Sequence, residues 1–137
     1  MLRHLVFYIC LACPAMAAES LSPEAFEAYT EGKTLFFSQN GQDYGAERYL
    51  SDRRVQWSFL DGECKEGRWY PDGQNICFIY EDRPDPQCWQ FSLTPQGLSA
   101  VFVSIPGAAL ELYEAREGDD MVCLGLFSAL EDQNRLP

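Results

Sequence analysis

The stretch that decides the fold is GRWYPDGQNICFIYEDRPDPQCWQF, residues 67–91, in which two turn signals separate three short apolar segments. The turn signals are Pro-Asp-Gly at 71–73 and Pro-Asp-Pro at 84–86, and such clusters interrupt regular structure. The segments between them have the length of strands rather than of helices. We therefore predict three successive β-strands, the last two over residues 75–81 and 88–93.

Side-chain alternation in the last two of these strands predicts an aromatic core. Successive residues of a strand point to opposite faces, so Ile76, Phe78 and Tyr80 share one face of their strand. The other face is also largely apolar, and we expect this strand to be covered on both sides. Trp89 and Phe91 share one face of the next strand and can pack beside the first set. The alternative interpretation is that these aromatic side chains line a ligand pocket.

The same pattern of short apolar runs and turn residues continues on both sides of this stretch, at intervals of about ten residues. None of the intervals is long enough for a parallel crossover through a helix. We predict an all-β fold, an antiparallel meander that closes into a small barrel or a strongly curved sheet of lipocalin-like type. The expected strands are 33–38, 46–50, 55–60, 67–70, 75–81, 88–93, 98–105 and 110–115.

One short N-terminal α-helix is expected before the first strand. Ser22 can cap it, Pro23 suits its first turn, and Gly32 can adopt the left-handed conformation that ends a helix. Phe26 and Tyr29 would share one face. The helix is therefore expected to act as a lid or plug on the sheet.

The chain begins with a pattern typical of a secretory signal peptide. Arg3 makes a cationic start, residues 5–13 are apolar, and small residues follow. We predict a signal peptide over residues 1–18, with cleavage after Ala17 or Ala18, and hence a periplasmic or secreted protein without a membrane span.

The remainder is expected to be one β-domain over residues 19–130, followed by a polar tail over 131–137. Lipid anchoring at Cys13 is the minor alternative to cleavage after the alanines.

Four cysteines remain after cleavage, an even number that predicts two disulfides in a small exported chain. Strand alternation places Cys77 opposite Cys88, which leaves Cys64 to pair with Cys123, although three connectivities are open. A metal site is not expected, because the spacings lack a C-x-x-C pair and His4, the one histidine, lies in the signal peptide.

The chain has 21 acidic and 10 basic residues and a formal net charge of −11. Such a charge repels nucleic acid and anionic lipid and attracts a cationic partner, although it also serves simply to keep an exported protein soluble. We expect no nucleic-acid binding.

Several motifs resemble those of small exported proteobacterial proteins that form families of unknown function. The motifs are a G-x-W turn at Gly67 and Trp69, an I-C-F strand at Cys77, and a following Cys-Trp strand at Cys88 and Trp89. The resemblance implies a secreted, disulfide-bearing β-fold with no established activity.

No catalysis and no cofactor are expected, because the loss of His4 removes the usual base for a serine or cysteine nucleophile. Two binding hypotheses remain. The first is a carrier of a small apolar ligand, and the second is an acidic interaction module that inhibits a cationic periplasmic or extracellular enzyme. The wall of the carrier's pocket would consist of Trp57, Phe59, Trp69, Phe78, Tyr80, Trp89 and Phe91.

Overall fold

The structure is a computed structural model that describes residues 18–124. The signal peptide predicted over residues 1–18 lies outside this range except for Ala18, and so do Cys13 and the polar tail predicted over 131–137. Within residues 18–124, no helix has the length and apolar character needed to cross a membrane.

The described chain consists of a short helix, a single 3-10 turn and eight strands. They are α1 (Pro23–Thr30), β1 (Thr34–Gln39), β2 (Gln42–Tyr49), η1 (Ser51–Arg53), β3 (Arg54–Ser58), β4 (Lys65–Asp72), β5 (Asn75–Tyr80), β6 (Gln87–Thr94), β7 (Gly97–Phe102) and β8 (Glu111–Glu117).

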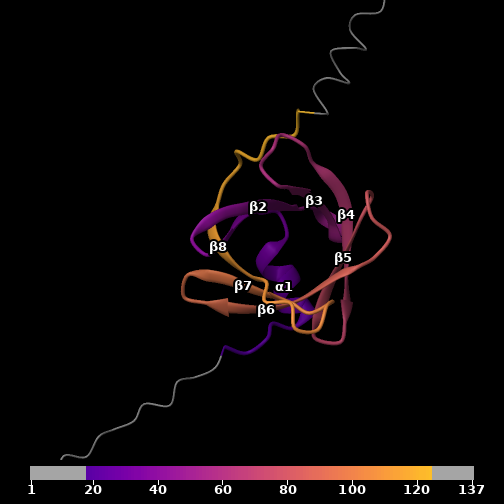
Figure 1. Cartoon of the computed structure of the whole chain (residues 1–137), viewed down its shortest axis with the longest axis vertical. Helices are drawn as coiled ribbons and strands as arrows, with labels where there is room; N and C mark the ends of the chain where they lie inside the picture. The colour runs from indigo at the N-terminus through magenta and orange to yellow at the C-terminus, as the bar shows by residue number, and fades with distance from the viewer. Residues whose placement is uncertain (1–17, 125–137) are drawn as a thin grey trace, which may run out of the picture.

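Each strand pairs antiparallel with the next one along the chain, and β8 pairs with β1 to close the barrel (Figure 1). This confirms the predicted all-β barrel with one short helix. The largest differences in strand length are at β4, which covers Lys65–Asp72 instead of 67–70, and at β2, which begins at Gln42 instead of residue 46, while β7 ends at Phe102 instead of residue 105. Pro106, which has no N–H to donate, and Gly107, with φ at +80°, lie in the loop that then connects β7 to β8.

The helix α1 plugs the barrel, and it lies inside the ring of strands in Figure 1. Ser22 Oγ caps α1 and Gly32 follows it with φ at +82°, as predicted. Phe26 is fully buried, with ring centroids 5.2 Å from Trp69 and 4.5 Å from Phe91. Burial of Phe26 therefore joins α1 to the core of the barrel.

Inward-facing side chains of all eight strands surround Phe26 and form the main core. Its buried strand residues are Leu35, Phe37, Tyr49, Val55, Trp69, Ile76, Phe78, Trp89, Phe91, Leu98, Ala100 and Leu112.

The prediction that residues 75–81 are covered on both faces is wrong at Ile79, which is 42% exposed. The outer face of a barrel wall meets solvent unless another segment covers it. Cys77 faces the same side and is buried, since it forms a disulfide with Cys88 of β6.

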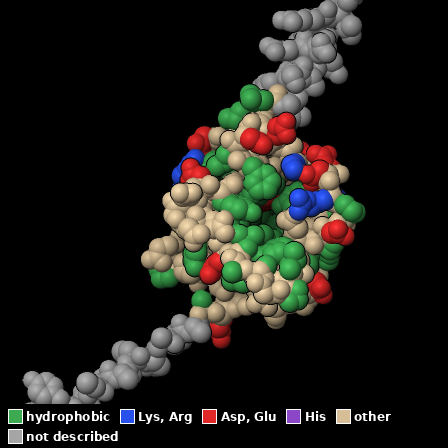
Figure 2. All heavy atoms as spheres, viewed as in Figure 1, with side chains coloured by type: hydrophobic (Ala, Val, Ile, Leu, Met, Phe, Trp, Pro, Cys, Tyr) green, Lys and Arg blue, Asp and Glu red, His purple; other side chains and the backbone are tan. Residues whose placement is uncertain are grey.

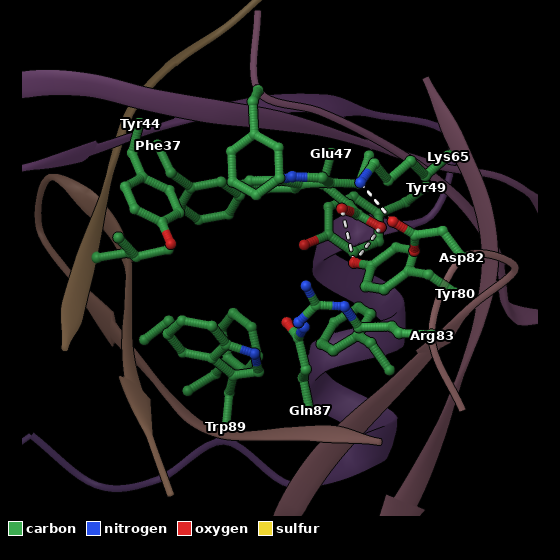
Figure 3. Close-up of a pocket in the computed structure, with 16 residues that line it drawn as sticks. Phe37, Tyr44, Glu47, Tyr49, Lys65, Tyr80, Asp82, Arg83, Gln87 and Trp89 are labelled. Carbon is green, nitrogen blue, oxygen red and sulfur yellow. Dashed lines mark hydrogen bonds and ion pairs between the residues drawn. The ribbon is translucent and has the colours of Figure 1, made fainter. Parts of the chain in front are cut away.

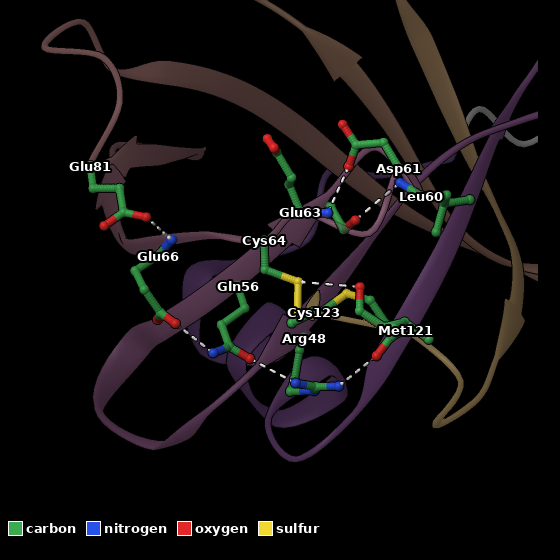
Figure 4. The surroundings of a disulfide bond; sticks show 12 residues. Arg48, Gln56, Leu60, Asp61, Glu63, Cys64, Glu66, Glu81, Met121 and Cys123 are labelled. Carbon is green, nitrogen blue, oxygen red and sulfur yellow. Dashed lines mark hydrogen bonds between the residues drawn. A yellow bond between two sulfur atoms is a disulfide. The ribbon is translucent and has the colours of Figure 1, made fainter. Parts of the chain in front are cut away.

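The C-terminal segment covers one part of the outer surface, over β1 and β2. Phe36 and Ala46 face outward there and are buried by Met121 and Cys123. The disulfide between Cys64 and Cys123 holds this segment against the barrel (Figure 4). Both predicted disulfides are therefore present.

Candidate ligand-binding pocket

The inside of the barrel is not completely filled, and a cavity of about 70 Å³ opens to solvent. Figure 2 shows this hollow with an apolar interior. Phe78 and Phe91 line the cavity and contact Phe26 of α1, so the plug supports the floor of the pocket. The volume exceeds the roughly 10–15 Å³ that one water needs and is smaller than the roughly 300–1,000 Å³ of drug-sized sites. The pocket can therefore take a small ring or a short branched group.

Nine of the 16 lining residues are aromatic, which makes the aromatic surface the dominant chemistry of the pocket. They are Phe37, Tyr44, Tyr49, Trp57, Phe59, Phe78, Tyr80, Trp89 and Phe91. Six of the seven wall residues expected from the sequence are among them.

The seventh expected wall residue, Trp69, does not line the pocket. It lies level with Phe78 in the β4–β5 register, where the ring of Phe26 packs against it. The Arg53 guanidinium lies 4.6 Å from the Trp69 ring centroid and is also paired with Glu27 of α1. Trp69 therefore packs against the helix, on the side of the barrel interior that α1 fills.

Two glycines make room for the aromatic walls. A Cβ atom on Gly67 would lie 2.6 Å from Cδ1 of Tyr80, and a Cβ atom on Gly45 would collide with the ring of Trp57. Real Cβ atoms do not approach other atoms so closely, so each ring can occupy its position only because the residue beside it on the neighbouring strand is glycine. The first residue of the G-x-W motif thus positions Tyr80 in the pocket.

A buried carboxylate, that of Glu47, lies among these rings. Glu47 belongs to β2 and is only 2% exposed. The Tyr80 hydroxyl donates its hydrogen bond to this carboxylate, with its oxygen 3.0 Å from Oε2 and 3.2 Å from Oε1 (Figure 3). Among the ion pairs of residues 18–124, none involves Glu47.

Burial raises the pKa of Glu47 well above its ordinary value, and the hydrogen bond from Tyr80 offsets this only in part. Burial also raises the pKa of the Tyr80 and Tyr49 hydroxyls, and the nearby Glu47 carboxylate adds to both shifts. Both tyrosine hydroxyls therefore remain protonated, and Tyr80 continues to donate to Glu47, while Glu47 is the group that titrates.

Charged and amide side chains lie at the mouth of the pocket. Lys65 forms an ion pair with Asp82, and this contact lowers the pKa of the Asp82 carboxyl. Arg83 is exposed, and Figure 3 shows its side chain directed toward the opening beside Gln87. The mouth is therefore polar, whereas the interior is aromatic.

Glu47→Gln is expected to be more stable than wild type, and the difference in the free energy of unfolding should grow as the pH rises. Below the ordinary glutamate pKa both the folded and the unfolded wild-type chains are protonated, and the fold has its full stability. Above it the unfolded chain loses the proton first, so the free energy of unfolding falls by about 1.4 kcal/mol per pH unit until the raised pKa of the folded state is reached.

Urea unfolding of wild type and Glu47→Gln at about pH 5 and about pH 8 measures this difference. Glu31→Gln is the control, because Glu31 is exposed at the end of α1. A stability difference between wild type and Glu47→Gln that does not change with pH would contradict the prediction.

Sequence reasoning missed the polar residues of the pocket, above all Glu47, and also Lys65, Asp82, Arg83 and Gln87. The sequence pattern that could have identified Glu47 lies in β2, where Glu47 and Tyr49 are two residues apart and so point to the same face of the strand. An acidic residue at an inward position of a barrel strand indicates either a strand end or a functional site.

Comparisons with protein-family models, with curated proteins and with solved structures give no match. The resemblance to exported proteobacterial proteins therefore remains a prediction. Within residues 18–124, no group of three or more His, Cys, Asp or Glu side chains is placed to hold a metal ion.

Proposed function

We propose that this protein is an exported, non-enzymatic binding protein that holds a small, largely apolar ligand at the open end of its barrel. The observation that carries the proposal is the aromatic surface around an open cavity of about 70 Å³. Aromatic walls with a few polar groups are typical of small-molecule sites. The volume limits the enclosed part of the ligand to about one ring or branched group.

Two further features support this proposal. The disulfides Cys64–Cys123 and Cys77–Cys88 suit an oxidising compartment outside the cytosol. The glycines at 45 and 67 keep the aromatic rings in place without filling the cavity. A preformed pocket of this kind binds without a large cost of ordering its walls.

Blocking the mouth is expected to abolish binding of a small aromatic probe. Gln87 is half-buried in the pocket wall on β6, so Gln87→Trp places a large ring in the opening. Gln90 lies on the same strand but is exposed, and Gln90→Trp is the matched control. Titration with benzyl alcohol, followed by tryptophan fluorescence and NMR chemical shifts, should show saturable binding to wild type and to Gln90→Trp. Equal binding to Gln87→Trp, or no binding to wild type, would contradict the proposed function.

The alternative function, an acidic module that inhibits a cationic enzyme, is supported by the net charge of −11. On the face shown in Figure 2 the acidic side chains lie around the perimeter and do not form one patch. This alternative predicts a complex with an enzyme such as lysozyme that dissociates at high salt. A complex that persists unchanged in high salt would count against it.

A further inference from the structure

Glu47 has hydrogen-bonding capacity that the described residues do not use. A carboxylate offers about four acceptor positions, whereas the Tyr80 hydroxyl supplies one proton shared between the two oxygens. Buried carboxylates are normally paired with a cation or remain protonated. Because Glu47 is 2% exposed and also lines the cavity, its spare acceptor positions are available to a group that enters the cavity.

The rings around Glu47 favour a positively charged group in the same place. The face of an aromatic ring carries negative electrostatic potential and attracts cations, most strongly when water is excluded. Trp57 is the cross-strand neighbour of Glu47 in the β2–β3 register, and Tyr80 hydrogen-bonds to it. A buried acid within aromatic walls is the combination of groups that recognises an organic ammonium ion.

We propose, on the basis of the function proposed above, that the ligand is a small organic amine or ammonium compound. Its cationic group contacts the Glu47 carboxylate, and its apolar part packs against the aromatic walls. The charges at the mouth do not oppose this arrangement strongly, because Lys65 is paired with Asp82 and the exposed Arg83 is screened by solvent. The net charge of −11 attracts cations toward the protein.

Binding of an amine is expected to depend on pH in a way that a neutral ligand cannot reproduce. A cation in the pocket stabilises the ionised form of Glu47, so binding releases the proton that the empty pocket retains. Below the raised pKa of Glu47 the affinity then increases about tenfold per pH unit. The titratable and charged groups that face Glu47 or line its pocket are Tyr44 and Tyr49 of β2, Tyr80 of β5, Lys65 of β4, and Asp82 and Arg83 of the β5–β6 loop, while Glu114 of β8 acts on Tyr49.

The test uses three probes of similar shape on the full folded chain: benzylamine, benzyl alcohol and phenylacetate. Benzylamine is expected to bind wild type about tenfold to hundredfold more tightly than benzyl alcohol, as for a hydrogen bond between charged groups, and phenylacetate more weakly than either. Glu47→Gln keeps the shape and the acceptor for Tyr80, so it should reduce benzylamine affinity by about the same factor, and it should reduce benzyl alcohol affinity much less because that probe carries no charge. Glu31→Gln, which removes one exposed charge, should change neither.

The outcomes separate this inference from the function on which it rests. If benzyl alcohol binds in the cavity but benzylamine binds no more tightly, or if Glu47→Gln leaves benzylamine affinity unchanged, the pocket function stands and the ammonium specificity is wrong. If none of the three probes binds wild type, both are wrong. Benzyl alcohol binding by Glu47→Gln shows that the variant is folded with its pocket intact.

Discussion

Replacing Phe26 by alanine is expected to destabilise the folded protein by about 3–5 kcal/mol, the usual cost of removing a buried aromatic side chain. Phe26 is fully buried, and its ring centroid lies within 6.4 Å of the centroids of Tyr49, Trp69, Phe78 and Phe91. Its loss would leave a cavity between α1 and the strands that these rigid rings cannot close. Urea unfolding followed by near-UV circular dichroism measures the loss.

The matched control is Phe59→Ala, a removal of the same side chain from the mouth of the barrel. Phe59 is 49% exposed, so its replacement should cost about 1 kcal/mol or less. Equal losses for Phe26→Ala and Phe59→Ala would show that α1 does not plug the barrel. A preserved stability in Phe26→Ala would lead to the same conclusion.

Removing the Cys64–Cys123 disulfide is expected to cost about 4 kcal/mol, and removing Cys77–Cys88 about 3 kcal/mol. The chain-entropy model gives these values because the first bridge spans 59 residues and the second spans 11. Loss of the bridge that closes the longer loop gives the unfolded chain the larger gain in conformational entropy. Urea unfolding of the two double-alanine variants compares them directly.

The two variants should also differ in which part of the fold unfolds locally. Loss of Cys64–Cys123 releases the segment that buries Phe36 and Ala46 on the outside of β1 and β2. Hydrogen exchange is then expected to accelerate at Leu124, whose N–H donates to the Gly62 carbonyl. In the Cys77–Cys88 variant this amide should remain protected. Equal protection of Leu124 in both variants would contradict the assigned role of the longer bridge.

Local sequence patterns were sufficient to predict the elements of the fold. Ser22 and Gly32 delimit α1 because capping acts through hydrogen bonds and dihedral angles within one or two turns. The strands were found because turn residues separate them at short intervals. The Cys77–Cys88 pairing followed from alternation on two consecutive strands joined by a short loop.

The pocket could be predicted only in part. Six aromatic wall residues were recognised because aromatic residues at alternate positions are a local pattern. Trp69 has the same pattern, but Phe26 from α1 fills the space beside it. Ile79 also continues an apolar run, and only the position of the disulfides and of the C-terminal segment decides which outer residues are covered.

The sequence by itself determined an all-β chain of short strands, a capped helix and an even set of cysteines, because these features depend on neighbours along the chain. Only the tertiary structure decided that Glu47 is buried beneath Tyr80, 33 residues further along the chain, in an aromatic pocket. Closure of the barrel through β1 and β8 creates that interior and removes water from the carboxylate. A contact that exists only after closure has no signature in any single segment.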